Sequence, residues 1–248
     1  MQLKWVAVIF NVWLLLSSAA WAEETLTDLI KRAEQGDAVA QTDLGAKYAL
    51  GSDVAIDYRE AKKWFHLAAL QGNALAQYHL GVIYANGEGT PADLKTAAEW
   101  YLKSAEQGDV LAQFNIGLMY VNGDGVPKQY REAHKWFKKA AEQGDALAQV
   151  NLGLMFIRGE GVEKNPDEAV KWFKLSAQQG DKNAQYHLGL CYFEGEGVPK
   201  DHQLAYMWLT LAATNQAHAI LDELNQELTA EQIANEQQRA AQWRPTAH

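Results

Sequence analysis

The residues best suited to chemistry in this sequence are its glycine pairs, its seven histidines and its single cysteine. Gly-x-Gly recurs between apolar segments, and the backbone amides of such loops can cradle a phosphate. The pairs are Gly87 with Gly89, Gly123 with Gly125, Gly159 with Gly161, and Gly195 with Gly197. Each follows a stretch of helical periodicity, and none has the third glycine or the Lys-Ser/Thr of a nucleotide loop. We therefore predict that these glycines end helices.

The histidines and the cysteine give no pattern of a reactive centre. No His-x-x-x-His or Cys-x-x-Cys spacing occurs, so no metal site is expected. Cys191 stands among apolar residues, which predicts a buried and inert thiol and leaves no partner for an internal disulfide. No serine lies in a Gly-x-Ser-x-Gly context. We predict no catalytic residue and no cofactor.

The first residues have the pattern of a targeting segment. A short positive start at Met1 to Lys4 precedes an apolar run from Trp5 to Leu16, and small residues then end in Ala20-Trp21-Ala22. This order predicts a cleavable signal peptide over 1–22 and a mature chain that begins at Glu23. An uncleaved membrane anchor is the alternative, although the apolar run is short for a spanning helix. We predict a periplasmic protein, with secretion into the medium as the alternative.

Composition bounds the class of partner. The 248 residues are 48% hydrophobic and carry a formal net charge of −9, without any run of lysine or arginine. Such a chain can bury a substantial core but has nothing to neutralise a row of phosphates. Nucleic-acid binding is therefore not expected, and membrane contact is expected only through an uncleaved first segment.

An internal repeat with a period of 36 residues dominates the rest of the chain. The register is marked by five glycines: Gly36, Gly72, Gly108, Gly144 and Gly180. Each copy continues with Ala-Gln, an aliphatic-Gly pair, an aromatic residue and a tryptophan, the last being Trp64, Trp100, Trp136, Trp172 and Trp208. Repeats of this length are typical of stacked supersecondary units that bury a continuous core.

Each repeat is predicted to be two antiparallel helices. Ala112, Ile116, Gly117 and Tyr120 share one helical face, as do Ala133, Trp136 and Phe137. The glycine linker should end the first helix, and Glu-Gln-Gly-Asp, as at 142–145, should end the second and cap the next. Gly117 is expected to permit close contact with Ala140 and Ala141. Asp53 replaces the second linker glycine in the first repeat, so its turn geometry is open.

The predicted fold is an all-α solenoid with capped ends. The segments are 23–35 as an N-terminal capping helix, 36–71, 72–107, 108–143, 144–179 and 180–216 as five repeats, and 217–248 as C-terminal capping helices and tail. Thr229-Ala230-Glu231-Gln232 has the form of a capping box that opens a last helix ending near Trp243. Residues from Arg244 onward are expected to fray.

The repeated pattern over 112–145, Ala-Gln-x-x-aliphatic-Gly and then Ala-x-x-Trp-Phe-x-x-Ala-Ala-x-x-Gly-Asp, resembles the Sel1-like repeat (SLR) family, relatives of tetratricopeptide repeats. The resemblance covers 36 to about 216 and implies a right-handed superhelix that acts as a scaffold or adaptor in protein complexes. Bacterial members are often exported. A cysteine-rich subset has been linked to beta-lactam binding or hydrolysis, but this chain lacks the cysteine pairs.

Columns that stay polar but vary between repeats are candidates for partner contact. One column is Asp43, His79, Asn115, Asn151 and His187; a second, two turns on, is Leu50, Asn86, Asn122, Arg158 and Glu194. A bulkier column beside them contains Tyr78, Phe114 and Tyr186, which by analogy with tetratricopeptide repeats would flank a concave groove. These residues are predicted to bind an extended or helical peptide. Equally open is the interpretation that the polar columns are solvated surface and that the aromatics pack between repeats.

Three classes of function follow. The leading one is an exported scaffold that binds a protein or peptide partner, in envelope assembly or signalling. The alternatives are an enzyme or binder acting on cell-wall or beta-lactam compounds, and a secreted factor that binds host proteins. The partner and the oligomeric state are not determined by the sequence.

Overall fold

The computed structural model describes residues 25–246, and every regular element in that range is an α-helix. Their bounds are α1 Leu26–Glu34, α2 Ala38–Leu50, α3 Tyr58–Leu70, α4 Ala74–Asn86, α5 Leu94–Glu106, α6 Val110–Asn122, α7 Tyr130–Glu142, α8 Ala146–Arg158, α9 Pro166–Gln178, α10 Lys182–Glu194, α11 His202–Ala212, α12 Asn215–Glu227 and α13 Ala230–Gln242. No helix within this range combines the length and apolarity needed to cross a bilayer. The predicted signal peptide, 1–22, lies outside the described residues.

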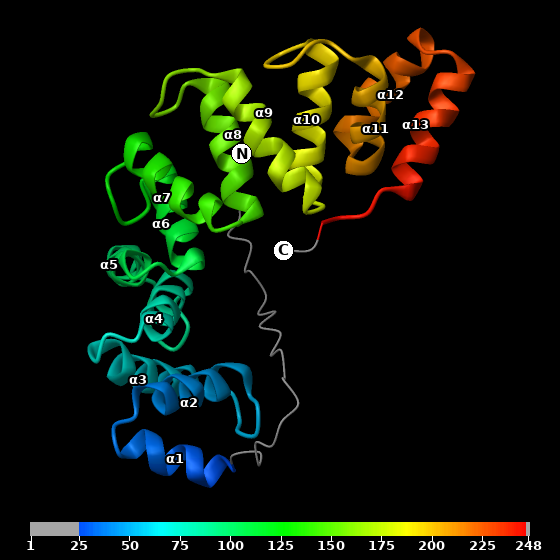
Figure 1. Ribbon diagram of the computed structural model, residues 1–248. Helices are drawn as coiled ribbons and strands as arrows, with labels where there is room; N and C mark the ends of the chain where they lie inside the picture. The colour runs from blue at the N-terminus through cyan, green and yellow to red at the C-terminus, as the bar shows by residue number, and fades with distance from the viewer. Residues whose placement is uncertain (1–24, 247–248) are drawn as a thin grey trace.

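The helices form a solenoid of hairpins. Each even-numbered helix from α2 to α10 packs against the helix that follows it, and each pair also packs on the next pair. Figure 1 shows the hairpins stacked into an arc, with α4 nearer than α5 to the hollow side. The first helix of a pair is called the inner helix below and the second the outer helix. The predicted all-α solenoid is confirmed.

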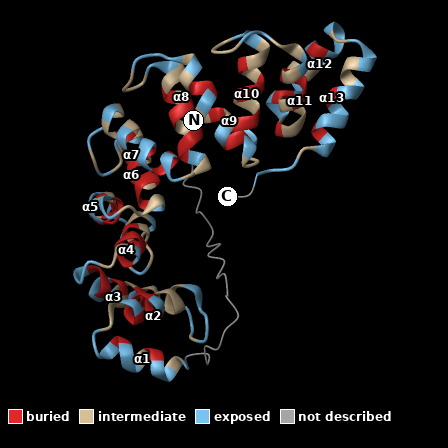
Figure 2. Ribbon diagram, in the orientation of Figure 1, coloured by how far each residue is buried: buried red, intermediate tan, exposed pale blue. Residues whose placement is uncertain are grey.

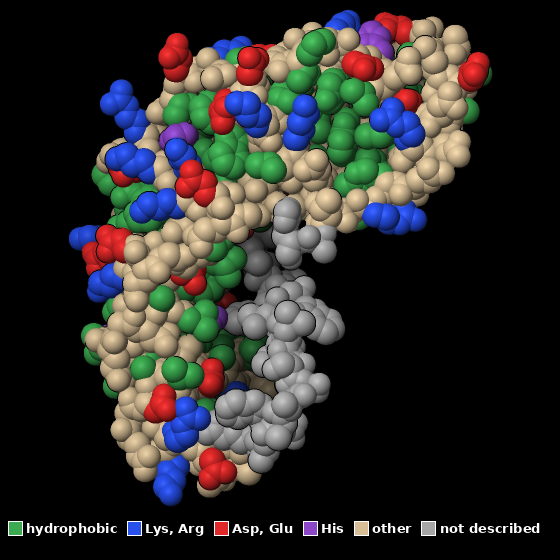
Figure 3. All heavy atoms as spheres, in the orientation of Figure 1, with side chains coloured by type: hydrophobic (Ala, Val, Ile, Leu, Met, Phe, Trp, Pro, Cys, Tyr) green, Lys and Arg blue, Asp and Glu red, His purple; other side chains and the backbone are tan. Residues whose placement is uncertain are grey.

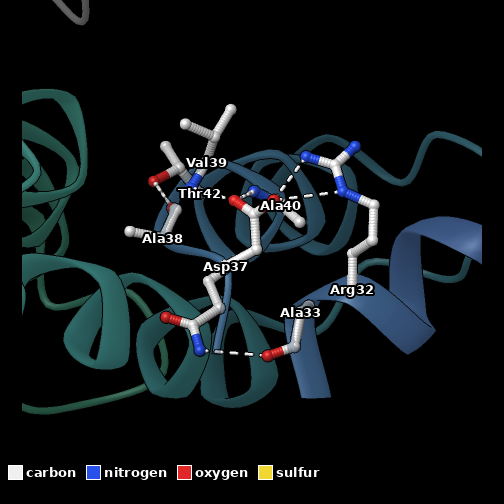
Figure 4. Close-up of polar contacts among 8 residues, drawn as sticks. Arg32, Ala33, Asp37, Ala38, Val39, Ala40 and Thr42 are labelled. Atoms are coloured by element: carbon white, nitrogen blue, oxygen red, sulfur yellow. Dashed lines mark hydrogen bonds and ion pairs between the residues drawn. The ribbon is translucent and has the colours of Figure 1, made fainter. Parts of the chain in front are cut away.

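Short polar signals start and end the helices as predicted. The side chains of Asp37, Asp109, Asp145 and Asp181 accept hydrogen bonds from backbone N–H groups in the first turn of the following inner helix. At the other end of each inner helix a left-handed glycine, such as Gly123 with φ 84°, forms the cap. Figure 4 shows the first of these boundaries, where Arg32 also pairs with Asp37.

In each hairpin a large side chain of the outer helix lies on a glycine of the inner helix, an aromatic ring in four repeats and Leu209 in the fifth. A β-carbon built on Gly117 would lie 2.7 Å from the ring of Phe137, so no larger residue fits without movement. The expectation that Gly117 contacts Ala140 and Ala141 is therefore corrected. Those alanines pack in a cluster with Ala148 of α8, in the next pair. Figure 2 shows the buried residues on the sides where helices face one another.

A buried glutamine on each inner helix links the helix before it to the outer helix that follows it. Gln113 Nε2 donates to the carbonyl of Ala105 at 3.1 Å, and its Oε1 accepts from Gln143 Nε2 at 2.8 Å. The same pair of bonds joins Gln41 to Ala33 and Gln71, Gln77 to Ala69 and Gln107, and Gln149 to Ala141 and Gln179. Gln185 makes only the first bond, to Ala177. The recurring Ala-Gln thus satisfies polar groups inside the stack.

The second linker glycine touches the preceding unit. A β-carbon on Gly125 would overlap the carbonyl of Leu94 at the start of α5, and one on Gly161 or Gly197 would meet the backbone at the start of α7 or α9. Asp53 occupies this position in the first repeat with φ 65°, a conformation in which a non-glycine residue is uncommon. Only the short α1 precedes that repeat, which removes the close backbone neighbour. The turn of the first repeat, whose geometry the sequence left undecided, therefore has a left-handed residue even without glycine.

The C-terminal end differs in part from expectation. The predicted capping box is present, since Thr229 and Gln232 exchange side-chain to backbone hydrogen bonds at the start of α13. The expected fraying from Arg244 onward is wrong for the described residues, because Thr246 N donates to the carbonyl of Gln178 at 2.9 Å. Trp243 packs edge-on against Trp208 with ring centroids 6.3 Å apart. The chain therefore returns to the end of α9.

The two glycines of one linker provide a matched test of inter-unit packing. Gly123→Ala should lower the free energy of unfolding by about 1–2 kcal/mol, the cost of a side chain at positive φ, since the atom nearest its β-carbon would be Cβ of Lys128 at 3.3 Å. Gly125→Ala should cost about 1–3 kcal/mol more, because its β-carbon would overlap the carbonyl oxygen of Leu94 in the preceding unit. Urea unfolding monitored by circular dichroism measures both. Equal losses would contradict the inter-unit contact.

Candidate functional site

Charge is distributed unevenly between the inner and outer helices. α4 and α6 contain no Asp, Glu, Lys or Arg, whereas α7 alone carries Arg131, Glu132, Lys135, Lys138, Lys139 and Glu142. Figure 3 shows charged side chains gathered on the outer edge of the arc beside α5 and α7. The inner helices α4 and α6 therefore carry no formal charge, although the protein as a whole is acidic.

The first predicted contact column is only partly exposed. Asp43 is exposed, Asn115, Asn151 and His187 are half-buried, and His79 is buried. The His79 ring stacks on Phe65 with centroids 4.7 Å apart, and His187 stacks on Phe173 at 5.2 Å. The expectation that His79 faces a partner is thus not met, because its ring covers the aromatic residue of the outer helix.

The amides of this column are tied to their own helices. Asn115 Nδ2 donates to the carbonyl of Leu111 at 2.8 Å, and Asn151 Nδ2 donates to the carbonyl of Leu147 at 2.8 Å. A side-chain amide also has an oxygen that can accept hydrogen bonds. Because their Nδ2 atoms are used within the helix, the two asparagines offer mainly these acceptors to a partner.

The bulky column belongs mostly to the core. Tyr78 and Phe114 are each 8% exposed and pack on Tyr101 and Phe137, with ring centroids 5.9 and 5.8 Å apart. Burial, with a smaller contribution from the charge of Asp109, raises the pKa of Tyr78 to about 12. Tyr186 is half-buried. Tyr78 and Phe114 therefore serve packing, which was the alternative left open above. This corrects their assignment as apolar contacts for a bound peptide.

The second predicted column is exposed and faces the linkers. Asn86 donates to Glu88 at 3.2 Å, Asn122 donates to Asp124 at 3.0 Å, and Arg158 lies 3.8 Å from Glu160. Glu194, in the same position of α10, is also exposed. These residues form the linker end of the inner surface, and Asn86, Asn122 and Arg158 each contact a carboxylate of the adjoining linker.

A row of exposed aliphatic residues escaped the sequence interpretation. Val39, Leu75, Leu111 and Leu147 occupy the second position of α2, α4, α6 and α8 and are 56, 45, 38 and 40% exposed. We call these four residues the aliphatic row. The signal was available in the sequence, since this column is apolar in four repeats although it lies off the buried stripe. Packing within the protein does not account for it.

An open depression of about 450 Å³ lies along α7 on the outer face. It is lined by charged side chains that engage one another, Lys135 with Glu132 at 2.6 Å and Lys138 with Glu142 at 3.7 Å. Lys139 lies over the ring of Trp136, 4.2 Å from its centroid. These contacts are typical of a solvated helix face.

The single cysteine of the chain is not an activated nucleophile. Cys191 is buried, and burial together with the nearby Glu196 and Glu194 raises the pKa of its thiol to about 12. Such a thiol stays protonated at neutral pH, and only the thiolate is a nucleophile. No three side chains of the metal-ligating types converge anywhere in 25–246.

Comparison with known protein families gives one match that covers most of the chain. The family model described as the Sel1 repeat matches residues 38–73, 74–109, 110–145, 146–181 and 182–216. Each matched segment holds one inner and one outer helix of the arc, from α2 with α3 to α10 with α11. A search of curated proteins found no match.

Solved structures similar to this chain have the same repeat. A Sel1 repeat protein from Oxalobacter formigenes is 34% identical with a TM-score of 0.77, and the match covers 87% of this chain and 92% of that protein. A protective antigen present in uropathogenic Escherichia coli strains, which displays an SLR fold, is 30% identical with a TM-score of 0.60. That match covers 88% of this chain and 55% of the antigen.

The buried His79 predicts a specific pH dependence. Burial lowers its pKa from 6.5 to about 4, so the unfolded chain binds a proton in this interval that the folded chain does not. Stability is therefore fully present above pH 6.5 and is lost as the pH falls towards 4, by about 3 kcal/mol in total. His79→Phe should lose less free energy of unfolding than the wild type between pH 7 and pH 4 in urea titrations. Parallel curves for the two proteins would refute the assignment.

Proposed function

Because the chain belongs to the Sel1 repeat family, we propose that it is an exported scaffold that binds a protein or peptide partner along its inner helices. Proteins of this family are generally interaction scaffolds rather than enzymes. The finer proposal is that the partner contacts the exposed and half-buried polar residues of α4, α6 and α8 and that the complex serves envelope assembly or signalling.

The absence of charge on two consecutive inner helices carries this proposal. In a chain with a formal net charge of −9, α4 and α6 lack any charged residue, while exposed Asn86 and Asn122 and half-buried Asn115 bring amides to their surface. Amides bind peptide backbone, and an uncharged surface is cheap to desolvate when a partner covers it. The charged outer helices keep the opposite face hydrated.

Charge placed on the inner helices should therefore block the partner. We would tag the chain at its C-terminus, express it in its native host, crosslink, and identify recovered proteins by mass spectrometry. Asn115→Arg with Asn151→Arg should reduce recovery of the partner by about tenfold or more, since two buried, unpaired charges each cost several kcal/mol. Ser52→Arg with Gln129→Arg adds the same charge at exposed linker positions and is the matched control.

The control variant should recover the same proteins as the wild type. Equal recovery by the inner-helix variant and the control would refute the inner surface as the binding site. Helicity should be the same in all three proteins, because Ser52 and Gln129 are exposed and Asn115 and Asn151 are half-buried at the surface of their helices.

Export is the second part of the proposal, supported by the order of positive, apolar and small residues over 1–22. Protein isolated from the periplasm of the native host should begin at Glu23 when its N-terminal peptide is sequenced by mass spectrometry. Ala20→Arg with Ala22→Arg removes the small residues that a signal peptidase requires, and we expect this variant to retain its first 22 residues. An intact N-terminus on the periplasmic wild type would contradict cleavage.

A further inference from the structure

The boundaries between units share one construction along an edge of the arc. Each consists of the last turn of one outer helix, a glycine with φ near 90° or above, and the first turn of the next inner helix. At four of these boundaries the inner helix contributes a member of the aliphatic row. Figure 4 shows the first boundary, where the side chain of Val39 points away from the capping contacts of Asp37.

The fifth boundary is already occupied by the chain itself. Thr246 N donates to the carbonyl of Gln178 in the last turn of α9, and Pro245 lies 3.5 Å from where a β-carbon on Gly180 would stand. At Gly36, Gly72, Gly108 and Gly144 no atom of the described residues lies within 4 Å of that point. The segment Trp243–Thr246 thus shows how an extended, proline-containing chain lies against a boundary.

The row position holds a polar residue at the one boundary that the C-terminal segment occupies. Asn183 replaces the aliphatic residue at the second position of α10, next to the boundary that the C-terminal segment covers. The four open boundaries keep an aliphatic side chain, and Leu70, 66% exposed, adds a further one at the end of α3. Exposed apolar residues that recur along one edge are candidates for a site of contact.

The hydrogen-bonding group that receives Thr246 is also repeated. Carbonyls in the last turn of a helix have no partner within that helix. Glu34, Leu70, Glu106 and Glu142 hold the position of Gln178 at the ends of α1, α3, α5 and α7. Each open boundary therefore has both a last-turn backbone acceptor and an exposed apolar side chain in the first turn of the next helix.

A polyproline II chain suits a row that recurs once in each repeat. Such a chain has three residues per turn, so every third side chain lies on one face. It has no internal hydrogen bonds, so the N–H groups of its residues other than proline are free to donate to the boundary carbonyls. Members of the row stand at the same position of successive repeats, so an extended segment that follows this edge passes them in turn.

We propose that the aliphatic row binds an extended, proline-containing segment of a partner protein, which places an apolar side chain at every third position against the row. The segment would donate backbone N–H groups to the last-turn carbonyls, as Thr246 does at the fifth boundary. This inference rests on the scaffold function proposed above and names the chemistry of its partner.

The test uses the chain from Glu23 to His248 and two fluorescein-labelled peptides, one of four Leu-Pro-Pro triplets and one of four Ser-Pro-Pro triplets. Fluorescence anisotropy should show binding of the first peptide and about tenfold or weaker binding of the second. Leu75→Ser, Leu111→Ser and Leu147→Ser combined should weaken the leucine peptide by about tenfold or more. Leu67→Ser with Leu175→Ser is the control, since these leucines of α3 and α9 are 40 and 42% exposed.

The outcomes separate this inference from the proposed function. Equal affinity of the triple variant and the control, or no binding to the wild type up to about 1 mM peptide, overturns the row as a site. If the triple variant still recovers the crosslinked partner in the native host, the scaffold function stands and the row is not its site. Wild-type dimers that the triple variant lacks, seen by size-exclusion chromatography with light scattering, would show that a second copy occupies the row.

Discussion

One contact repeats through the whole molecule: the side chain of the outer helix lies directly on the glycine of the inner helix. In each repeat the two lie so close that a β-carbon on the glycine would overlap the side chain. The pairs are Gly45 with Phe65, Gly81 with Tyr101, Gly117 with Phe137, Gly153 with Phe173, and Gly189 with Leu209. This distance fixes how the two helices of a pair approach one another. Because each pair has the same approach, the alanines, tryptophans and glutamines of successive pairs fall into continuous columns. The arc and its inner surface are consequences of that regularity.

Features set by local chemistry were predictable from the sequence. The caps at Asp109 and Asp145, the left-handed glycines and the capping box at Thr229 depend on residues within a few positions, so a single sequence specifies them. The partner of Gly117 was not predictable in the same way. Periodicity assigns Phe137 and Ala140 to one face of the outer helix, but the rotation of that helix decides which of them meets the glycine. The need for glycine at 125 likewise depends on the preceding unit, which no local pattern reveals.

The candidate site shows the same limit. His79 was assigned to the surface because its column is polar, yet its ring covers Phe65 and is buried. Leu111 would ordinarily be assigned to the core because it is aliphatic, yet it is exposed. Both follow from position: in the middle of an inner helix the hairpin partner covers neighbouring side chains, whereas the first turn projects beyond the stack. Residue type alone therefore misassigns His79 and Leu111, whereas the exposed Asp43, Asn86 and Asn122 lie where the column pattern put them.

The two ends of the stack are closed by different means. At the N-terminal end α1 supplies the carbonyl of Ala33, so Gln41 makes both bonds of the glutamine ladder. At the C-terminal end α11 is shorter, ending at Ala212, and among the described residues no donor reaches the buried Oε1 of Gln185. An unsatisfied buried acceptor costs about 1–3 kcal/mol, so the last unit has less stability of its own than the units before it. Trp243 against Trp208 and Thr246 on Gln178 bring the end of the chain back to this unit. The same contact is an example of an extended segment bound at a unit boundary. Closing the stack and binding a segment both require a last-turn carbonyl and free access to the glycine turn.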